Sequence, residues 1–415
     1  MGYFYLNYPL FNLEKVVIIL IVTGYIMMIG INERWDQMAI AQINVAVVGC
    51  GVISDIYLQS LQDKFTITHV VACNDRNPEK MRAKAAKYHI KAMSYDAILA
   101  DPDIQLIVNL TTPKAHYSII KQALMHGKHV FSEKMMAVEL AEGQELCALA
   151  KAKNLRLGVA PDTFLGGGIQ TARYIVDHAL IGDPLSVVVS LNRNFRVYAD
   201  IFPHMNQRGG TLPFDTGCYY LTALASILGP AKQVSAFGRR YQPERVGQRT
   251  DKPWFGEKST VADDNILTAT MAYQNGVLAT VHFNSENILN EDPQMTLFGS
   301  AGILKMGDPN NFDSPNYLTK QLNDPVKFPF THGFLENSRG LGVADMAWAI
   351  QQQRPHRASM EMAYHVFELI HGMYQSAETG SIYQLQSTFD RPTPLPTGYL
   401  DNGFWGPTEE SALAF

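Results

Sequence analysis

The chain has 415 residues, a length that predicts two to three domains. Hydrophobic residues make up 47% of it and charged residues 18%, the balance of a globular protein with substantial apolar cores. The formal net charge is −5 and no long basic stretch occurs, so nucleic acid is not an expected partner. The four cysteines are far apart and form no C-x-x-C pair, which argues against a disulfide framework or a metal site and fits a reducing cytoplasm.

The first 37 residues stand apart because of an apolar run, residues 16–31, with Lys15 the one basic residue before it. As a helix this run would span roughly 24 Å, whereas the hydrocarbon core of a bilayer is about 30 Å thick. The segment lacks a twin arginine and the basic region of a signal peptide. Three interpretations stay open: Met38 is the natural start, the run is a membrane-anchor helix, or it is a helix packed on the protein. We favour Met38 as the start, and we expect a cytoplasmic protein with no stable membrane partner.

Residues 43–159 alternate short β-rich runs with helix-length segments, which is the pattern of a parallel, doubly wound α/β sheet. The predicted strands are residues 43–48, 67–73, 105–110, 128–132 and 155–160. The predicted helices are residues 54–62, 77–88, 115–126 and 139–153. We therefore expect five or six parallel strands in a Rossmann dinucleotide-binding domain at residues 38–160. A second domain is expected at 161–397 and a tail at 398–415.

The first predicted strand ends in a glycine-rich turn, with Gly49 and Gly51 at the first two positions of a G-x-G-x-x-G motif. The first glycine allows a tight turn, and the second lets the backbone approach a pyrophosphate. Ser54 stands at the third position, where a small side chain is tolerable. Because the motif follows an apolar strand and opens a helix, we expect this turn and the next residues, Val52 and Ile53, to bind the cofactor.

A carboxylate follows the second predicted strand. Asp75 lies 26 residues after Gly49, near the usual offset of the group that binds the adenosine ribose. A carboxylate there repels a 2′-phosphate and so favours NAD as the cofactor. Arg76 supplies the alternative, because it could accept the 2′-phosphate of NADP or lie flat on the adenine.

The third predicted strand leads into a turn with two small hydroxyl side chains and a proline. Thr111, Thr112 and Pro113 let the backbone run beside the cofactor, and we include all three in the expected cofactor site. His116 lies one turn into the following helix. It either contacts the cofactor or makes a structural hydrogen bond at the helix start.

The most informative chemical signal is a pair, Glu133 and Lys134, at the end of the fourth predicted strand. A lysine at the carboxyl end of such a sheet is well placed to meet a nicotinamide ring. A carbinol releases a hydride only if its hydroxyl proton is also withdrawn, so its oxygen needs a cation or a base within hydrogen-bonding reach. Partial desolvation beside an oxidised nicotinamide predicts a lowered pKa for Lys134.

A second group of polar residues lies on a helix predicted at residues 213–228. Asp215 and Tyr219 are four residues apart, so they point the same way. Asp215 is expected to bind a substrate hydroxyl or to orient the lysine. A phenol has a pKa near 10, so Tyr219 can act as a general base only if a cation lowers that value. Otherwise Tyr219 orients the substrate or packs in the protein.

Four segments, residues 45–54, 111–116, 123–134 and 209–220, together resemble the Gfo/Idh/MocA oxidoreductases. The resemblance implies a Rossmann domain followed by an α+β domain with a large open, mostly antiparallel sheet, and a homo-oligomer, either a dimer or a tetramer. It also implies oxidation of a sugar or cyclitol hydroxyl, or reduction of the ketone, with NAD(P). The lysine of the family's E-K-P motif contacts the reacting hydroxyl, a role that falls on Lys134. Met135 replaces the proline of that motif, and Tyr219 replaces the histidine of a D-x-G-x-H motif.

The second domain carries further candidate features. Asp162 and Thr163 follow the last Rossmann strand and are expected to reach a sugar hydroxyl. The glycines at residues 166–168 are either an anion site or a plain loop, and we favour the loop. Hairpins are predicted at residues 265–284, with Asn275 and Gly276 as the turn, and at 294–306. Helices are predicted at 339–353 and 360–380.

These features favour an NAD-dependent dehydrogenase or reductase of a carbohydrate or cyclitol, with Lys134, Tyr219 and Asp215 as the catalytic residues. Two alternatives stay open. One is an NAD-dependent glycosidase that oxidises the sugar transiently, eliminates the aglycone and reduces the product again. The other is a cofactor-sensing binding protein without turnover, against which the retention of both Lys134 and Asp215 argues.

Overall fold

The computed structural model describes residues 16–22, 25–31, 41–321 and 323–397. These fall into two compact units, divided between Ala41 and Gln42. In the first unit, β1 (Val16–Val22) and β2 (Tyr25–Ile31) pair antiparallel. Two of our three interpretations of this run, a membrane-anchor helix and a helix packed on the protein, are therefore wrong. Val and Ile dominate β1, and β-branched residues favour extended backbone over helix. The rest of residues 1–37 and the tail at 398–415 lie outside the described residues, among which no helix is long and apolar enough to cross a bilayer.

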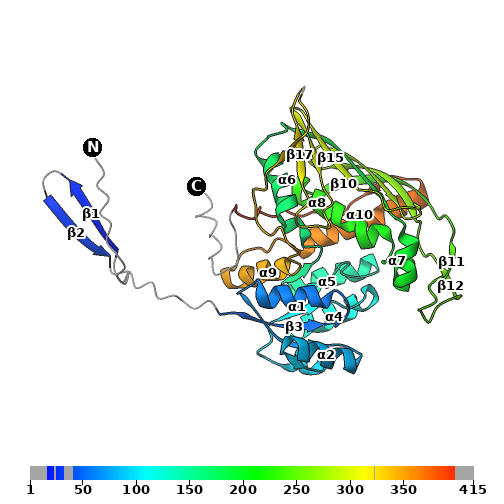
Figure 1. The fold of residues 1–415 in the computed structure, drawn as a ribbon, viewed down its shortest axis with the longest axis horizontal. Helices are drawn as coiled ribbons and strands as arrows, with labels where there is room; N and C mark the ends of the chain where they lie inside the picture. Colours follow the sequence, from blue (N-terminus) through cyan, green and yellow to red (C-terminus); the bar gives the residue numbers. More distant parts are fainter. Residues whose placement is uncertain (1–15, 23–24, 32–40, 322, 398–415) are drawn as a thin grey trace. The chain divides into compact units, whose positions relative to one another are not determined.

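The second unit begins with a six-stranded parallel sheet in the order β5-β4-β3-β6-β7-β8 (Figure 1). Its strands are β3 (Ile43–Val48), β4 (Thr68–Asn74), β5 (Lys91–Ala92), β6 (Leu106–Asn109), β7 (His129–Ser132) and β8 (Leu157–Val159). Its helices are α1 (Ser54–Asp63), α2 (Pro78–Tyr88), α3 (Tyr95–Ala100), α4 (Pro113–Met125) and α5 (Leu140–Ala152). The doubly wound fold is confirmed. The sequence patterns do not predict β5 and α3, since β5 has only two residues, both exposed, and α3 has only six.

The chain order reverses at β3, which lies between β4 and β6. In open α/β sheets, ligands bind beyond the carboxyl ends of the strands at such a switch point. Every strand end that we singled out from the sequence, on β3, β4, β6 and β7, therefore opens onto the same edge of the sheet. The fold gathers the predicted cofactor residues there.

The rest of the second unit contains a nine-stranded sheet in the order β18-β17-β16-β15-β9-β14-β13-β10-β19. Its strands are β9 (Pro184–Asn192), β10 (Ala231–Arg239), β13 (Ile266–Tyr273), β14 (Leu278–Asn284), β15 (Gln294–Gly299), β16 (Gly302–Met306), β17 (Asn316–Thr319), β18 (Val326–Phe328) and β19 (Tyr383–Gln384). Only the β9–β14 pair in this sheet is parallel. The predicted mostly antiparallel sheet is confirmed, as are the two predicted hairpins, β13–β14 and β15–β16. A separate small sheet pairs β11 (Glu244–Val246) with β12 (Lys258–Thr260).

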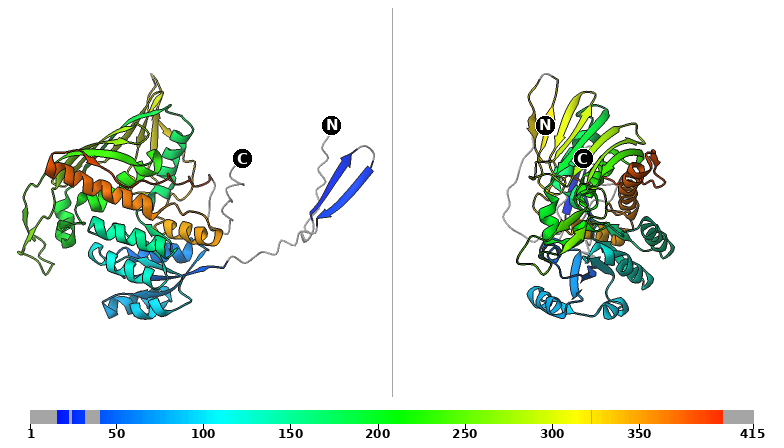
Figure 2. Two further views of the ribbon diagram at one scale, coloured as in Figure 1. Left: turned by 180° about the vertical axis from the view of Figure 1, so that it is seen from behind. Right: turned by 90° about the vertical axis from the view of Figure 1, so that its right-hand side faces the viewer.

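One face of the large sheet is covered and the other is open. Figure 2 shows the long helix α10 lying along the sheet on the side of the Rossmann domain. The helices of this part are α6 (Gly167–Asp177), α7 (Phe195–Ile201), α8 (Cys218–Leu228), α9 (Leu341–Gln352) and α10 (Met360–Thr379). Along β9, Val187, Val189 and Leu191 are buried, whereas Val188 between them is exposed. This alternation is expected of a strand with one face in the core.

The ends of α10 follow ordinary capping rules. Ser359 accepts a hydrogen bond from the N–H of Met362 at the start, and Gly380 adopts a left-handed conformation at the end. Of the two histidines on this helix, His365 is buried and His371 is half-buried, which fits a packing role. His365 accepts a hydrogen bond from the N–H of Ala231 at 2.9 Å, and His371 lies edge-on to Phe367.

Candidate active site

The glycine-rich turn after β3 has the geometry that the motif predicts. Gly49 has a φ of +104°, and a β-carbon there would lie 2.7 Å from the carbonyl group of Leu110. Only glycine fits such a position. A β-carbon on Gly51 would meet no atom of the described residues within 4 Å, so the backbone at Gly51 faces open space among them. That open space beside the turn fits the pyrophosphate of a dinucleotide. Val52 is 83% exposed, whereas Ile53, which directly precedes α1, is half-buried.

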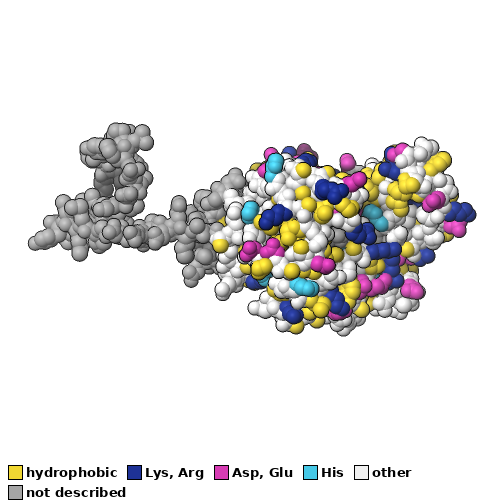
Figure 3. All heavy atoms as spheres, turned by 90° about the horizontal axis from the view of Figure 1, so that it is seen from below, with side chains coloured by type: hydrophobic (Ala, Val, Ile, Leu, Met, Phe, Trp, Pro, Cys, Tyr) yellow, Lys and Arg dark blue, Asp and Glu magenta, His cyan; other side chains and the backbone are white. Residues whose placement is uncertain are grey.

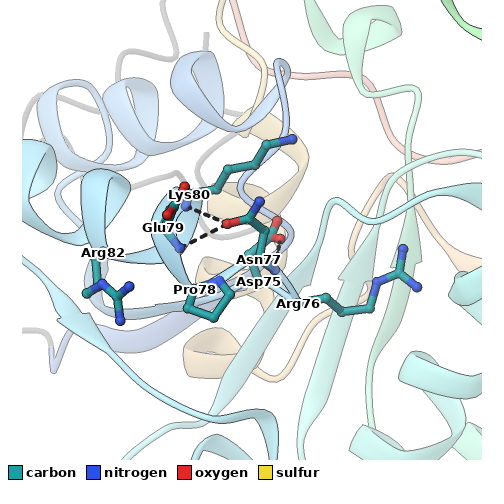
Figure 4. Close-up of a pocket in the computed structure, with 7 residues that line it drawn as sticks. All are labelled: Asp75, Arg76, Asn77, Pro78, Glu79, Lys80 and Arg82. Carbon is teal, nitrogen blue, oxygen red and sulfur yellow. Dashed lines mark hydrogen bonds between the residues drawn. The ribbon is translucent and has the colours of Figure 1, made fainter. Parts of the chain in front are cut away.

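The carboxylate of Asp75 is tied to this turn. It accepts hydrogen bonds from the N–H of Cys50 and the N–H of Asn77, both at 2.8 Å. It also lines an open pocket of about 750 Å³ with residues 76–80 and Arg82. In Figure 4 the side chains of Arg76 and Arg82 lie on opposite sides of Pro78, at the start of α2. The pocket therefore presents Asp75 and dispersed cations rather than a single cationic clamp.

The turn between β6 and α4 is stabilised by a hydrogen bond between its own side chains. Thr111 donates from its hydroxyl to Asn109 at 2.7 Å, and Thr112 and Pro113 begin α4. The ring of His116 has no exposed surface. Its Nδ1 lies 2.6 Å from the carbonyl oxygen of Met135 and its Nε2 lies 2.9 Å from that of Thr111. His116 therefore joins two backbone segments of the site, and the structural alternative is the one its surroundings support.

Glu133 is buried at the end of β7. Its carboxylate accepts a hydrogen bond from the phenol of Tyr57 at 2.8 Å and another from the N–H of Lys134 at 3.1 Å. Tyr57 comes from α1, the helix that follows the glycine-rich turn. The pair thus links the cofactor turn to the strand end that carries Lys134. Sequence reasoning missed Tyr57, because an aromatic residue on an apolar helix face looks like ordinary core.

Lys134 forms an ion pair with Asp215, a residue of the second domain. The ammonium of Lys134 donates to the Asp215 carboxylate at 2.8 Å, and the two side chains are 17% and 23% exposed. Asp215 lies in a single π-helical turn, Pro213–Gly217, that precedes α8, and Thr216 donates to its other oxygen at 3.1 Å. The peptide bond between Lys134 and Met135 is cis. The predicted convergence of the Rossmann edge with this helix is present in the structure.

The surroundings of Lys134 hold it in the ammonium form. Burial alone would lower its pKa, but the negative charges of Asp215 and Glu133 and the neighbouring Tyr219 outweigh burial and raise the pKa well above its usual value. The pKa of Lys134 is therefore shifted in the opposite direction to the lowering that we expect beside an oxidised nicotinamide. In the chain by itself, Lys134 is a proton donor at neutral pH.

Tyr219 lies against Lys134, with the ammonium 5.8 Å from the centre of its ring. Burial raises the pKa of Tyr219 to about 12, although Lys134 and Arg339 both act to lower it. Tyr219 could act as a general base only if a cation lowered its pKa below the usual value. In the chain by itself its pKa is raised instead, so this condition is not met. Tyr219 is therefore a neutral phenol at the edge of the site, able to donate a hydrogen bond to a substrate oxygen.

Asp162 and Thr163 are not open to a substrate, so our prediction that they reach a sugar hydroxyl is wrong. Their side chains are 1% and 2% exposed. The Asp162 carboxylate accepts hydrogen bonds from the N–H groups of Gly340 at 2.8 Å and Gly342 at 3.0 Å. It thus caps the N-terminus of α9, and burial raises its pKa to about 6. The sequence showed only that Asp162 follows a strand, not which distant backbone would cover it.

Comparison with known proteins identifies both parts of the second unit. Residues 43–160 match the family model of an oxidoreductase family with an NAD-binding Rossmann fold. Residues 169–305 match the Gfo/Idh/MocA C-terminal domain. The chain belongs to the Gfo/Idh/MocA oxidoreductase family. The resemblance drawn from its motifs is confirmed, and so is NAD as the cofactor type of its Rossmann domain.

Two curated members of the family illustrate the similarity. An uncharacterized oxidoreductase of Schizosaccharomyces pombe is 29% identical over 202 residues, which cover 47% of this chain and 54% of that protein. D-xylose dehydrogenase of Paenarthrobacter nicotinovorans is 29% identical over 178 residues, which cover 41% of this chain and 46% of that protein. The chain thus spans about half the length of these Gfo/Idh/MocA relatives.

A solved structure extends the likeness of fold over both domains of this Gfo/Idh/MocA chain. Levoglucosan dehydrogenase, in complex with NADH and L-sorbose, superposes with a TM-score of 0.73 and 18% identity. The superposition covers 83% of this chain and 99% of that one. The two proteins share a fold.

Proposed function

We propose that the protein is an NAD-dependent dehydrogenase or reductase that transfers a hydride between nicotinamide and a sugar or cyclitol carbinol or ketone. The observation that carries the proposal is the 2.8 Å contact between Lys134 and Asp215, which sets a cation from the Rossmann edge against a carboxylate of the second domain. The names of the relatives support the substrate class, since D-xylose dehydrogenase and levoglucosan dehydrogenase both act on sugars.

The residues that would hold the cofactor lie along one edge of the sheet. Gly49 forms the turn and Gly51 leaves space for the pyrophosphate, while the exposed part of Asp75 is available to a ribose. The backbone at Thr111 and Thr112 borders the path toward Lys134. NAD, when bound there, supplies the hydride acceptor or donor; NADP remains the alternative that Arg76 would serve.

The proton chemistry of the site follows from its charges. In reduction, the Lys134 ammonium donates a hydrogen bond and then a proton to the carbonyl oxygen of the substrate. In oxidation the same step runs in reverse: Lys134, after releasing its own proton to solvent, accepts the proton of the substrate hydroxyl and returns to the ammonium form. Asp215 orients Lys134 and keeps it charged. Tyr219, as a neutral phenol, orients the same oxygen by a second hydrogen bond.

We also propose a homo-oligomer, either a dimer or a tetramer, in the cytoplasm. The open face of the large sheet supports the oligomer, because it exposes apolar side chains in several strands, including Val188, Phe237 and Leu278. Figure 3 shows both positive and negative side chains on the face of the molecule seen from below the view of Figure 1. The cysteines are free thiols, which fits a reducing compartment.

A cofactor screen tests the proposal. Purified protein is incubated with NAD or NADP and a panel of sugars, inositols and glycosides, and formation of the reduced cofactor is followed by absorbance. We expect steady reduction of NAD by one or more free sugars or inositols. Cleavage of glycosides without net reduction would instead identify the glycosidase, and NAD binding with no reaction of either kind would identify a sensor.

The variant Lys134→Met tests the proposed role of the lysine directly. Loss of the ammonium should lower turnover by about 10²–10⁴-fold, the usual contribution of a proton donor or acceptor, while the dissociation constant for NAD changes little. Lys153→Met, on an exposed lysine after α5, is the matched control and should keep full activity. Activity of Lys134→Met close to that of the control would exclude the proposed role of Lys134.

A further inference from the structure

Three glycines, at residues 166–168, bring two distant loops together. A β-carbon at these positions would lie 2.6 Å from the ring of Phe312, 2.5 Å from Leu335 and 2.7 Å from the carbonyl oxygen of Ser314, respectively. Any side chain would therefore push the loops apart. The N–H groups of all three glycines already donate to backbone carbonyls, so this segment is not an anion site. Its function is to let the loops at 310–314 and 332–339 approach each other closely.

A pocket of about 280 Å³ lies between these two loops. It is lined by Asn310, Asn311, Phe312, Asp313, Leu335, Glu336, Asn337 and Arg339. Pockets for drug-sized ligands begin at about 300 Å³, so this one suits a single ring rather than a large molecule. Its walls are mainly polar, with amide groups that can both donate and accept hydrogen bonds.

Arg339 joins this pocket to the proposed active site. Its guanidinium donates to the side-chain oxygens of Asn337 at 2.9 Å and Asn310 at 2.7 Å. It also interacts with the phenol of Tyr219, beside Lys134. The buried cap from Asp162 to Gly340 fixes the backbone next to Arg339. The pocket and the proposed catalytic cluster thus share one side chain that is held in place from both sides.

The positively and negatively charged side chains around the pocket are equal in number. Lys64 pairs with Glu336 at 3.3 Å, and Arg339 and Asp313 add one positive and one negative charge to the lining. The guanidinium of Arg339 is occupied by neutral oxygens. An anionic sugar would therefore find no surplus positive charge here. Hydroxyl groups, which donate and accept equally well, match the amides and the carboxylate better.

Two lining side chains are available to a ligand. Asn311 and Asp313 are exposed, and their side chains make no hydrogen bond or ion pair within the part of the chain that the structure describes. Because they support no other element, they can be changed without disturbing the fold. They provide the acceptors and donors that a bound hydroxylated ring would use.

We propose that this pocket is a substrate subsite for an uncharged, hydroxyl-bearing ring, and that Arg339 aligns it with Tyr219 and Lys134. The proposal rests on the proposed sugar dehydrogenase function. The ring is either the part of the reacting sugar remote from the oxidised carbon or a second sugar unit linked to it. Both present the same chemistry to the pocket, and the experiment below distinguishes them.

The test uses the double variant Asn311→Ala/Asp313→Ala in the full chain. The matched control is Asn323→Ala/Asp324→Ala, which changes the same two residue types at exposed positions outside the pocket lining. For the best sugar of the cofactor screen and for a disaccharide that carries it, kcat and KM are measured with all three proteins. Loss of one or two hydrogen bonds should raise KM about tenfold in the pocket variant, with kcat unchanged.

The pattern of KM values identifies the source of the ring. A rise for the disaccharide alone assigns the pocket to a second sugar unit, whereas an equal rise for both assigns it to the reacting sugar. Unchanged KM values for both substrates in the pocket variant overturn the proposal while leaving the dehydrogenase function intact. A rise of the same size in the control variant also overturns it.

A binding measurement keeps the proposal testable if no turnover is found. Calorimetric titration of the NADH-loaded protein with D-glucose, D-xylose, maltose and D-glucuronate needs no reaction. We expect a neutral sugar to bind, and to bind about tenfold more weakly to the pocket variant than to the control. No binding of any neutral sugar, or tighter binding of D-glucuronate than of D-glucose, would overturn the uncharged-ring assignment.

Discussion

The phenol of Tyr57 donates a 2.8 Å hydrogen bond to the carboxylate of Glu133, and both side chains are buried. The two residues are 76 positions apart, one on the helix after the glycine-rich turn and the other beside Lys134. The contact ties the helix that follows the cofactor turn to the strand end that bears the proposed catalytic lysine. The contact gives Tyr57 a positioning role that its sequence context does not suggest.

Tyr57→Phe should destabilise the protein. The substitution keeps the ring but leaves a buried carboxylate oxygen without its donor, which costs about 2 kcal/mol. The free energy of unfolding, measured by denaturant titration, should fall by that amount. Tyr117→Phe is the control, because the Tyr117 phenol bonds to Glu145 at an exposed site and its loss should cost less than about 0.5 kcal/mol. Equal losses in both variants would contradict the role of Tyr57.

The two glycines of the cofactor turn should respond differently to alanine. Gly49→Ala places a methyl group 2.7 Å from the Leu110 carbonyl at a φ of +104°, so the fold itself should lose about 1–3 kcal/mol. Within the part of the chain that the structure describes, the new methyl group of Gly51→Ala meets no atom within 4 Å, so this variant should unfold like the wild type. Its methyl group would, however, occupy the space of the pyrophosphate. NADH fluorescence titration should show at least about tenfold weaker binding by Gly51→Ala, and unchanged binding would place the cofactor elsewhere.

Asp75→Asn should change the choice of cofactor. The amide oxygen can still accept a hydrogen bond from the Cys50 or the Asn77 backbone, but the negative charge that repels a 2′-phosphate is gone. We expect the wild type to favour NAD and the variant to shift the ratio of kcat/KM toward NADP by about tenfold. Asp103→Asn, at an exposed position of the same domain, is the control. A wild type that already favours NADP would give Arg76 the dominant role instead.

The ionisation of Asp162 should make the free energy of unfolding depend on pH. Burial raises its pKa from 3.8 to about 6, so the native state binds this proton more tightly than the unfolded chain does. The stability that this provides is complete below the unfolded pKa and is lost as the pH rises through about 6. Relative to Asp162→Asn, the wild type should therefore lose up to about 3 kcal/mol between pH of about 4 and about 7.

Urea titrations of both proteins across this pH range provide the measurement. Asp292→Asn, on an exposed loop, corrects for the general loss of one carboxylate. A difference between wild type and Asp162→Asn that stays constant with pH would show that Asp162 titrates like a solvent-exposed carboxylate. A difference that grows in the opposite direction would show that its hydrogen bonds from Gly340 and Gly342 outweigh burial.

Local patterns in the sequence determined most of the fold. The strand at residues 43–48, the turn glycine Gly49 and the hairpin at Asn275 and Gly276 are all decided within windows of about ten residues or fewer. Strand alternation, turn chemistry and helix caps depend on neighbours along the chain. For that reason the sequence by itself also determined which strand ends would share one edge of the sheet, and so where Lys134 would lie.

Only the tertiary structure decided which polar groups remain available for chemistry. Asp162 was expected to be open, yet it is covered by the backbone at Gly340, 178 residues away. The pKa values of Lys134 and Tyr219 depend in the same way on partners from other elements, Asp215 and Arg339 among them. Burial and charge are set by where distant segments meet. Periodicity and spacing along the chain do not predict contacts between distant segments, because those contacts depend on how the whole molecule packs.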